Sequence, residues 1–199
     1  MNFYLISPPR ECKHFNYNNF KKILESINVK YLQLRPKYEN DKQNKNYITK
    51  YFKIFDKICR LNKIKLIIND DVNLVKELQS DGVHLGQDDL PTEVVRRQLG
   101  MTKLIGRTTH SFKQGQIAKA AGADYISVGP IWDTPSKPGR PGIGFDYLET
   151  AHRLDIPYVA IGGINLTNID DILHHNPPLI GAIRSISTIE ELWKKIKKS

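Results

Sequence analysis

The chain has 199 residues, of which 40% are hydrophobic and 26% charged, so its composition excludes disorder or a fibrous repeat as its main state. No apolar run approaches the roughly 18 residues of a membrane span, and the apolar start ends at Pro8-Pro9-Arg10-Glu11, so we expect no membrane segment, no signal peptide and a cytoplasmic location. The net charge of +9 is compatible with nucleic acid, anionic lipid or anionic small molecules, but no nucleic-acid-binding motif is present, and much of the excess lies in lysine-rich helices typical of a solvated surface.

Eight short apolar segments alternate with segments of helical periodicity. The predicted strands are Phe3–Ile6, Tyr31–Leu34, Leu66–Ile68, Gly82–Leu85, Lys103–Gly106, Tyr125–Val128, Tyr158–Ile161 and Ile180–Ile183. Between them the apolar residues follow the i, i+3, i+4, i+7 spacing of helices, as in Phe20, Ile23, Leu24 and Ile27. The eighth helical segment runs from Trp193 to the end.

Strands that alternate with helices and are apolar throughout predict a parallel sheet with helices outside it. Eight such units predict a closed (β/α)₈ TIM barrel, with residues 1–199 as a single domain. An open doubly wound sheet is the alternative, but it commonly has five or six strands, and no Gly-x-Gly-x-x-Gly follows the first strand.

In such a barrel the functional groups follow the strands, and these positions are rich in polar and basic residues. Gly162-Gly163 follows the seventh strand and is expected to lead into a helix whose N–H groups bind phosphate, with Arg184 after the eighth strand as a further donor. A tight turn with a surface arginine is the alternative interpretation.

Two carboxylates follow neighbouring strands at the predicted barrel mouth. Asp70 and Asp89 together fit a Mg²⁺ site, since this ion prefers oxygen ligands. The alternative for Asp70 is a cap for a helix over Asp71–Gln79. Arg35 and Lys37 follow the second strand. With Lys137 they form either a cationic cluster for a diphosphate or solvated surface charge.

Two histidines and a long loop complete the set of candidates. His84 lies within an apolar strand and is interpreted as an interior histidine with satisfied hydrogen bonds. His110 is either a helix-start residue or an acid/base group. The segment Trp132–Gly144 holds three prolines and three glycines in 13 residues, which predicts an active-site lid.

Taken in order, these motifs resemble those of the superfamily of thiamine phosphate synthases and thiazole tautomerases. The matching segments are Leu32–Lys37, Ile68–Asp70, Asp81–Pro91, Ile105–Ser111, Gly122–Pro130, Thr134–Gly139 and Ala160–Ile164. Each is weak alone, but they occur in family order over residues 31 to 186. The resemblance implies the TIM-barrel fold.

For a synthase the resemblance implies a Mg²⁺-assisted transfer. A pyrimidine diphosphate, 4-amino-2-methyl-5-hydroxymethylpyrimidine diphosphate, would join a thiazole phosphate to give thiamine phosphate and pyrophosphate. The implied catalytic residues are Arg35, Lys37, Thr108 and Lys137, and the implied metal ligands are Asp70 and Asp89. The implied substrate-binding residues are Gln33, Arg35, Lys37, Asn69, Thr108, His110, Thr134, Ser136, Lys137, Gly163, Ile183 and Arg184. The implied partners are these small molecules, with no nucleic acid or membrane, and a homodimer is left open.

The sequence departs from the synthase pattern at three positions and leaves two other functions open. Thr108 and Arg184 stand where the family commonly has serine, and Ser136 replaces a threonine. One alternative is a thiazole tautomerase, in which a histidine matching His110 acts as acid/base. The other is a non-catalytic phosphate-ligand binder on the same barrel. The set of diphosphate-handling residues favours the synthase.

Overall fold

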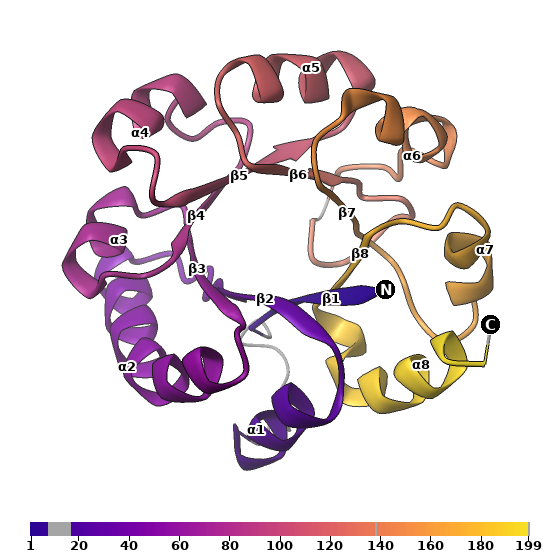
Figure 1. Cartoon of the computed structure of the whole chain (residues 1–199), viewed down its shortest axis with the longest axis horizontal. Coiled ribbons are helices and arrows are strands. Elements are labelled where there is room, and N and C mark those ends of the chain that lie inside the picture. Colours follow the sequence, from indigo (N-terminus) through magenta and orange to yellow (C-terminus); the bar gives the residue numbers. More distant parts are fainter. Residues whose placement is uncertain (8–16, 138, 199) are drawn as a thin grey trace.

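The computed structural model describes residues 1–7, 17–137 and 139–198. Eight parallel strands close into a barrel in sequence order, with β1 paired to both β2 and β8 (Figure 1). The strands are β1 (Asn2–Ile6), β2 (Val29–Leu34), β3 (Lys65–Asn69), β4 (Gly82–Leu85), β5 (Leu104–Thr109), β6 (Tyr125–Val128), β7 (Tyr158–Ala160) and β8 (Leu179–Ala182). The predicted TIM barrel is confirmed and the open sheet is excluded.

Helices surround the barrel and cover the outer faces of its strands (Figure 1). They are α1 (Tyr17–Ser26), α2 (Asp41–Leu61), α3 (Val72–Leu78), α4 (Thr92–Leu99), α5 (Phe112–Ala120), α6 (Asp146–Ala151), α7 (Ile169–His174) and α8 (Ile189–Ile196), with short 3₁₀ helices η1 (His152–Leu154) and η2 (Arg184–Thr188). The last helix, predicted to carry Trp193, is confirmed; it begins at Ile189, and Ile189 and Leu192 pack into the core from its first turn. No helix among the described residues is both long and apolar enough to cross a membrane.

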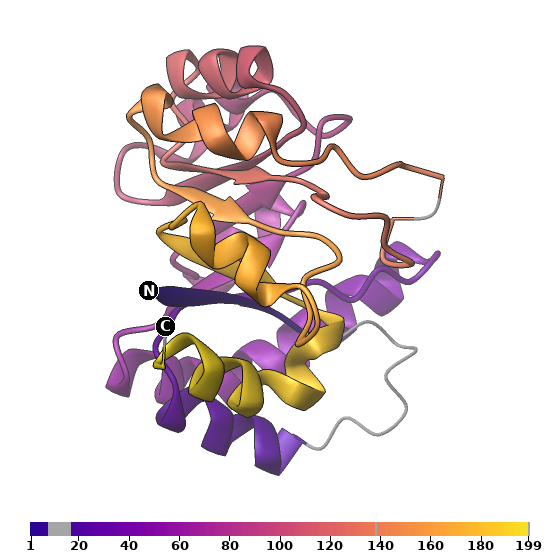
Figure 2. The ribbon, with the colours of Figure 1, turned by 90° about the vertical axis from the view of Figure 1, so that its right-hand side faces the viewer.

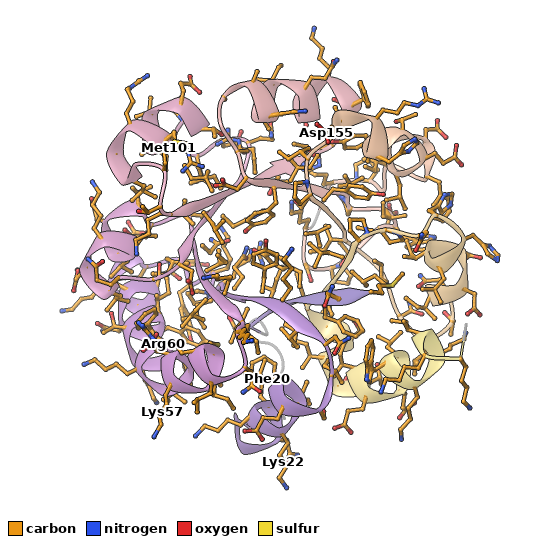
Figure 3. All side chains as sticks on the ribbon, in the orientation of Figure 1. Phe20, Lys22, Lys57, Arg60, Met101 and Asp155 are labelled. Carbon is orange, nitrogen blue, oxygen red and sulfur yellow. The ribbon has the colours of Figure 1, made fainter. Side chains whose placement is uncertain are left out.

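Side chains alternate between two hydrophobic layers along each strand. On β1, Phe3 and Leu5 pack with the helices, whereas Tyr4 and Ile6 point into the barrel. Tyr4, Tyr31 and Tyr125 fill much of the interior, with Tyr31 stacked on Tyr125 at a centroid distance of 5.1 Å. Figure 3 shows side chains filling both the barrel centre and the layer beneath the helices. Bulky rings in the interior make it a packed core, so the polar groups gather where the strands end.

Three strand boundaries differ from the prediction in a way that moves candidate residues. The third strand runs to Asn69 instead of Ile68, so Asn69 lies on β3. The fifth strand runs to Thr109 instead of Gly106, because Thr108 and Thr109 pair with Ser127 and Val128 on β6. Thr108 is therefore held on a strand and not in a loop. Conversely, Ile183 lies just after β8, in the connection to η2.

The predicted lid is the connection between β6 and α6, and its base is firmly attached. The amides of Ile131 and Trp132 donate to the carbonyls of Ile161 and Gly162 at 3.0 and 3.1 Å. Ile143 returns beside them and donates to Pro130 O at 2.8 Å. Figure 2 shows the loop extending past the strand ends. Only its tip, residues 133–141, can act as a lid; Pro138, like the Pro8–Glu11 segment, lies outside the described residues.

Candidate active site

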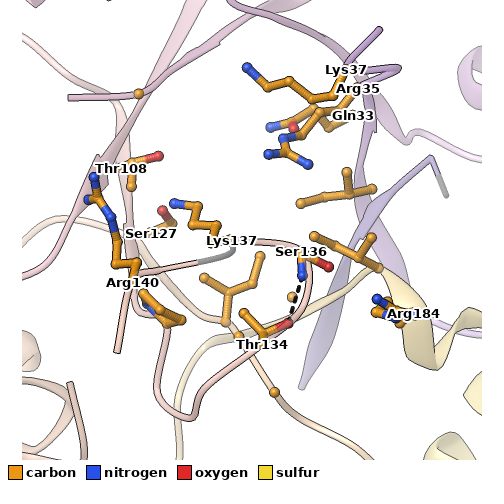
Figure 4. A pocket seen from close by; sticks show the side chains of 18 of the residues that line it. Gln33, Arg35, Lys37, Thr108, Ser127, Thr134, Ser136, Lys137, Arg140 and Arg184 are labelled. Atoms are coloured by element: carbon orange, nitrogen blue, oxygen red, sulfur yellow. Dashed lines mark hydrogen bonds between the residues drawn. The ribbon is translucent and has the colours of Figure 1, made fainter. Parts of the chain in front are cut away.

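The carboxyl ends of the strands surround a cavity of about 690 Å³ (Figure 4). Every residue that the sequence predicted for metal or substrate binding lines this one cavity. These residues are Gln33, Arg35, Lys37, Asn69, Asp70, Asp89, Thr108, His110, Thr134, Ser136, Lys137, Gly163, Ile183 and Arg184. The geometry thus brings the whole set together, while the role of each residue remains a prediction.

Cationic side chains gather on the β2 side of the cavity. Arg35 and Lys37 follow β2, and Lys37 Nζ lies 2.6 Å from Asp70 Oδ2. Lys137 extends from the lid into the same cavity, with its ammonium group on the side of Ser127 and Thr108 (Figure 4). Burial, followed by the charges of Arg35, Arg140 and Lys37, lowers the pKa of Lys137 to about 8. The cations are therefore close enough to repel one another, as expected of a site for a polyanion and not of scattered surface charge.

The two roles considered for a carboxylate after β3, cavity ligand and helix cap, are taken by two different residues, Asp70 and Asp71. Asp71 caps α3 by accepting a hydrogen bond from Leu74 N at 2.9 Å, so Asp70 is left to face the cavity. Asp70 has left-handed backbone geometry with φ of 63°, and Lys37, its ion-pair partner, has φ of 52°. Non-glycine residues seldom adopt this region, and such residues cluster at functional sites.

Asp70 and Asp89 face the same cavity and lie close enough for each to shift the pKa of the other. Burial and the contact with Asp89 raise the pKa of Asp70. Burial also acts to raise the pKa of Asp89. Asp70, the Gly86 amide that donates to Asp89 Oδ2 at 2.6 Å, and the charges of Lys37 and Arg107 together outweigh burial and lower that pKa. The two groups thus shift each other's pKa in opposite directions, as expected of an interacting pair of carboxyl groups.

The described residues contain no cluster of three or more His, Cys, Asp or Glu side chains that would hold a metal ion by themselves. The pair of Asp70 and Asp89 nevertheless suits Mg²⁺, which is commonly bound by one or two carboxylates and completes its shell with water and substrate phosphate. A divalent ion there would stabilise both carboxylates in their charged form.

Arg107 braces the loop that carries Asp89, a role that the sequence did not reveal. Its guanidinium donates to Leu90 O at 2.8 Å and to Gln87 O at 3.1 Å. The side chain of Gln87 in turn donates to Thr108 O. These contacts fix the β4–α4 loop to β5. Sequence spacing cannot predict them, because they depend on the pairing of β4 with β5.

His110 connects the lid tip to the barrel. Its Nδ1 lies 2.5 Å from Gly129 O, which only accepts, so Nδ1 carries the proton and Nε2 accepts from Arg140. Burial lowers the pKa of His110, and the nearby Lys137 and Arg140 act in the same direction. The helix-start role belongs to Ser111, whose Oγ accepts from Gln114 N.

The predicted phosphate side differs from the expectation in one respect. Gly162-Gly163 does not lead directly into a helix, because α7 begins only at Ile169. Both glycines have positive φ, and an added Cβ at Gly163 would lie 2.6 Å from Trp132 Cβ, so packing against the lid base already requires a glycine there. The short helix that does begin at the mouth is η2, whose first residue is Arg184. Figure 4 shows Arg184 well apart from Arg35 and Lys37.

The floor of the cavity contains buried polar groups. His84 is 8% exposed, and its Nε2 lies 3.0 Å from Thr108 Oγ1, which confirms the interior interpretation. Burial, with Lys137, Arg35 and Arg107 nearby, lowers the pKa of His84 to about 3, so the ring is neutral. Ser127 on β6 also lines the cavity, and sequence analysis missed it. The i, i+2 spacing of Tyr125 and Ser127 was the available signal.

Fold and site define a TIM-barrel protein with a cavity at the carboxyl ends of its strands that is lined by several cationic side chains. A family model described as thiamine monophosphate synthase matches residues 3–186, and the chain belongs to this family.

Curated relatives named thiamine-phosphate synthase agree with this assignment. The protein of Thermosynechococcus vestitus is 38% identical over 71% of this chain and 42% of its own length. That of Nostoc punctiforme is 34% identical over 94% and 52%, and that of Halalkalibacterium halodurans is 37% identical over 85% and 79%. The chain thus spans about half, or less, of the length of the first two relatives.

Solved structures support the fold. A thiamine phosphate pyrophosphorylase from Pyrococcus furiosus superposes with a TM-score of 0.79 at 24% identity, covering 98% of this chain and 96% of that one.

Proposed function

We propose that the protein is a thiamine-phosphate synthase. It condenses 4-amino-2-methyl-5-hydroxymethylpyrimidine diphosphate with a thiazole phosphate and releases pyrophosphate. The observation that carries this proposal is the concentration of Arg35, Lys37 and Lys137 beside the paired carboxyls of Asp70 and Asp89 in one cavity. This arrangement suits a departing polyanion better than it suits the activation of a nucleophile.

The chemistry requires two changes at one carbon. The bond between the pyrimidine methylene carbon and the diphosphate oxygen breaks, and its electron pair leaves with the oxygen. The thiazole nitrogen then donates its lone pair to the carbon cation. Arg35, Lys37 and Lys137 stabilise the negative charge that grows on the leaving group. Mg²⁺ held by Asp70 and Asp89 would supply further charge neutralisation there.

The remaining residues hold the two substrates. Gln33, Asn69 and Thr108 would bind the pyrimidine at the cavity floor. The thiazole phosphate would lie at the opposite side, with its phosphate near the β7 and β8 ends. Its contacts would come from Thr134, Ser136, Gly163, Ile183 and Arg184. A cytoplasmic location and a homodimer remain predictions from the sequence.

The tautomerase alternative receives less support from His110. Both of its ring nitrogens are engaged, one by Gly129 O and the other by Arg140, so neither is available to a substrate while the lid tip stays in this position. A general base needs a nitrogen within hydrogen-bond reach of the proton that it removes.

The deciding experiment mixes both synthase substrates with the protein and Mg²⁺ and measures thiamine phosphate and pyrophosphate by mass spectrometry. A parallel reaction offers a thiazole phosphate carboxylate, with and without Mg²⁺. Formation of thiamine phosphate only with Mg²⁺ supports the synthase. Isomerisation of the thiazole without Mg²⁺ supports the tautomerase, and ligand-induced thermal stabilisation without turnover in either assay supports the non-catalytic binder.

A further inference from the structure

A continuous chain of hydrogen bonds crosses the barrel beneath the cavity, and we name it the barrel relay. It links Gln33, Tyr4, Tyr125, His84 and Thr108. The distances are 2.7 Å from Gln33 Nε2 to Tyr4 Oη, 2.8 Å from Tyr4 Oη to Tyr125 Oη, 3.3 Å from Tyr125 Oη to His84 Nδ1, and 3.0 Å from His84 Nε2 to Thr108 Oγ1. All five side chains are buried, and they come from five different strands.

The direction of the first hydrogen bond, from Gln33 to Tyr4, determines the direction of every other hydrogen bond in the relay. Because Gln33 Nε2 donates to Tyr4, the hydroxyl proton of Tyr4 goes to Tyr125, and that of Tyr125 goes to His84 Nδ1. His84 is neutral, so its one proton lies on Nε2 and is donated to Thr108 Oγ1. Thr108 keeps its own hydroxyl proton for the cavity.

The two ends of the barrel relay therefore have opposite character. Gln33 Oε1 is an acceptor, is buried, and has no hydrogen-bond partner in the described part of the chain. Thr108 offers a donor. Both residues line the cavity, and Figure 4 shows them on opposite sides of it. A buried acceptor without a partner is costly, so a ligand donor is needed to satisfy it.

The barrel leaves room for this relay at one glycine. A Cβ at Gly106 on β5 would lie 2.1 Å from Tyr125 Cζ and 2.5 Å from His84 Nδ1. Tyr31 stacks on Tyr125 and holds its ring, with 22° between the two planes. The contact between Tyr125 and His84 therefore depends on a glycine at position 106 and on the stacking of Tyr31 against Tyr125.

The opposite direction of the relay is less favourable electrostatically. It would require the Gln33 amide to turn its NH₂ group toward the cavity, where Arg35 and Lys137 lie. These cations act on the floor strongly enough to lower the pKa of His84. Their positive field attracts an amide oxygen and repels an amide NH₂ group, which favours the direction described above.

We propose that Tyr4, Tyr125 and His84 are positioning residues that fix which end of the pocket accepts and which end donates, and so select an aminopyrimidine over its oxo counterpart. An aminopyrimidine offers an N–H to Gln33 and a ring-nitrogen acceptor to Thr108. The oxo form carries a carbonyl and a ring N–H instead, which reverses this pattern and leaves buried groups unpaired. The identity of the ring rests on the proposed function; the polarity of the relay does not.

The first test measures the tautomer of His84 by ¹⁵N NMR in the ligand-free protein, with the signal assigned by its loss in His84→Gln. We expect the Nε2–H form in the wild type and in the matched control Tyr31→Phe, which loses a hydroxyl from the same interior cluster but outside the relay. In Tyr125→Phe the donor to Nδ1 is gone, so the Nε2–H form should lose its preference and a mixture of the two neutral tautomers should appear. The Nδ1–H form in the wild type overturns the proposal without any variant.

The second test uses calorimetric titration of the same proteins with 4-amino-2-methyl-5-hydroxymethylpyrimidine diphosphate and with its 4-oxo counterpart, both with Mg²⁺. The wild type and Tyr31→Phe should prefer the amino compound by about 100-fold or more, and Tyr125→Phe should lose at least about tenfold of this preference. Equal weakening of both compounds would mean a purely structural role and overturns the proposal. If the wild type binds neither compound while His84 has the expected tautomer, the proposed function and the aminopyrimidine assignment fail but the relay polarity stands.

Discussion

The ammonium group of Lys137 lies among other cations, and this environment determines how long it keeps its charge as the pH rises. Burial and its cationic neighbours lower its pKa to about 8. A lysine carries its charge below its pKa, so without a ligand Lys137 loses its charge around pH 8 instead of near the ordinary value for lysine. The lid cation is therefore the titrating member of the diphosphate site.

We expect pyrophosphate to bind more weakly as the pH rises from 7 to 9.5, because Lys137 becomes neutral in the free protein. Arginine stays protonated throughout this range, so Lys137→Arg should reduce that pH dependence. Calorimetric Kd values for pyrophosphate with Mg²⁺ across this range test the expectation. Identical pH profiles for the wild type and Lys137→Arg would show that another group titrates.

The metal site can be tested with variants of Asp70 and Asp89, and Asp71, the neighbour of Asp70 outside the cavity, provides the control. Asp70→Asn and Asp89→Asn should each lower Mg²⁺-dependent kcat/KM by about 10²-fold or more, since each removes a ligand that neutralises the leaving group. Asp71→Asn should have little effect, because asparagine is an equally good helix cap and Asp71 lies outside the cavity. Steady-state rates at several Mg²⁺ concentrations measure the difference. Full activity of Asp89→Asn at low Mg²⁺ contradicts the assignment.

At the scale of elements, the β6–α6 connection combines a fixed base with a tip that has fewer attachments. Backbone hydrogen bonds hold residues 131–132 and 143–144, whereas Arg140 joins the tip to β5 through His110. Opening this loop therefore needs to break the Arg140 contact but not the base. Few buried contacts and exposed backbone are the features of segments that open locally.

We expect the amides of residues 133–141 to exchange quickly without ligand and more slowly with pyrophosphate and Mg²⁺. Arg140→Ala should speed exchange in the ligand-free tip while leaving the base unchanged. Hydrogen–deuterium exchange measured by mass spectrometry separates the two regions, and the base segments serve as an internal control. Equal exchange of the tip with and without ligand would mean that the loop is rigid and does not act as a lid.

At the scale of the whole molecule, the sequence predicted the barrel and the residues around its mouth because both follow from local patterns. An apolar strand followed by polar residues identifies a strand end, and parallel strands bring all such ends to one face. Most of the polar residues that line the cavity were thus predictable from position, but Ser127, which lies inside β6, was not.

Contacts that join distant strands could not be predicted in this way. The Tyr4–Tyr125 hydrogen bond joins residues 121 positions apart, and the Arg107 brace depends on strand register. The offset of α7 from Gly163 was missed for another reason. Glycines with positive φ occur in tight turns as well as at anion sites, and here packing against Trp132 already requires one.

The closed barrel places the two proposed phosphate sites on different sides of the mouth. Strands β2 and β3 are separated from the β7–β8 end by β1 in one direction and by three strands in the other. The net charge of +9 attracts both substrates, but the local cations decide where each phosphate binds. Arg184 and Lys137 should therefore affect different substrates.

Arg184→Ala should raise the KM for the thiazole phosphate about 10- to 150-fold and leave the KM for the pyrimidine diphosphate nearly unchanged. A charge-assisted phosphate contact contributes roughly 1.5–3 kcal/mol, which gives this range.

Lys137→Ala should instead lower kcat, because the charge that it stabilises grows as the bond to the diphosphate breaks. The control for lost positive charge is Arg60→Ala on the outer surface of α2, which should alter neither parameter. Steady-state kinetics with each substrate varied in turn separate these effects. If Arg184→Ala and Lys137→Ala weaken the same substrate equally, both phosphates share one site, and the separation imposed by the barrel does not govern binding.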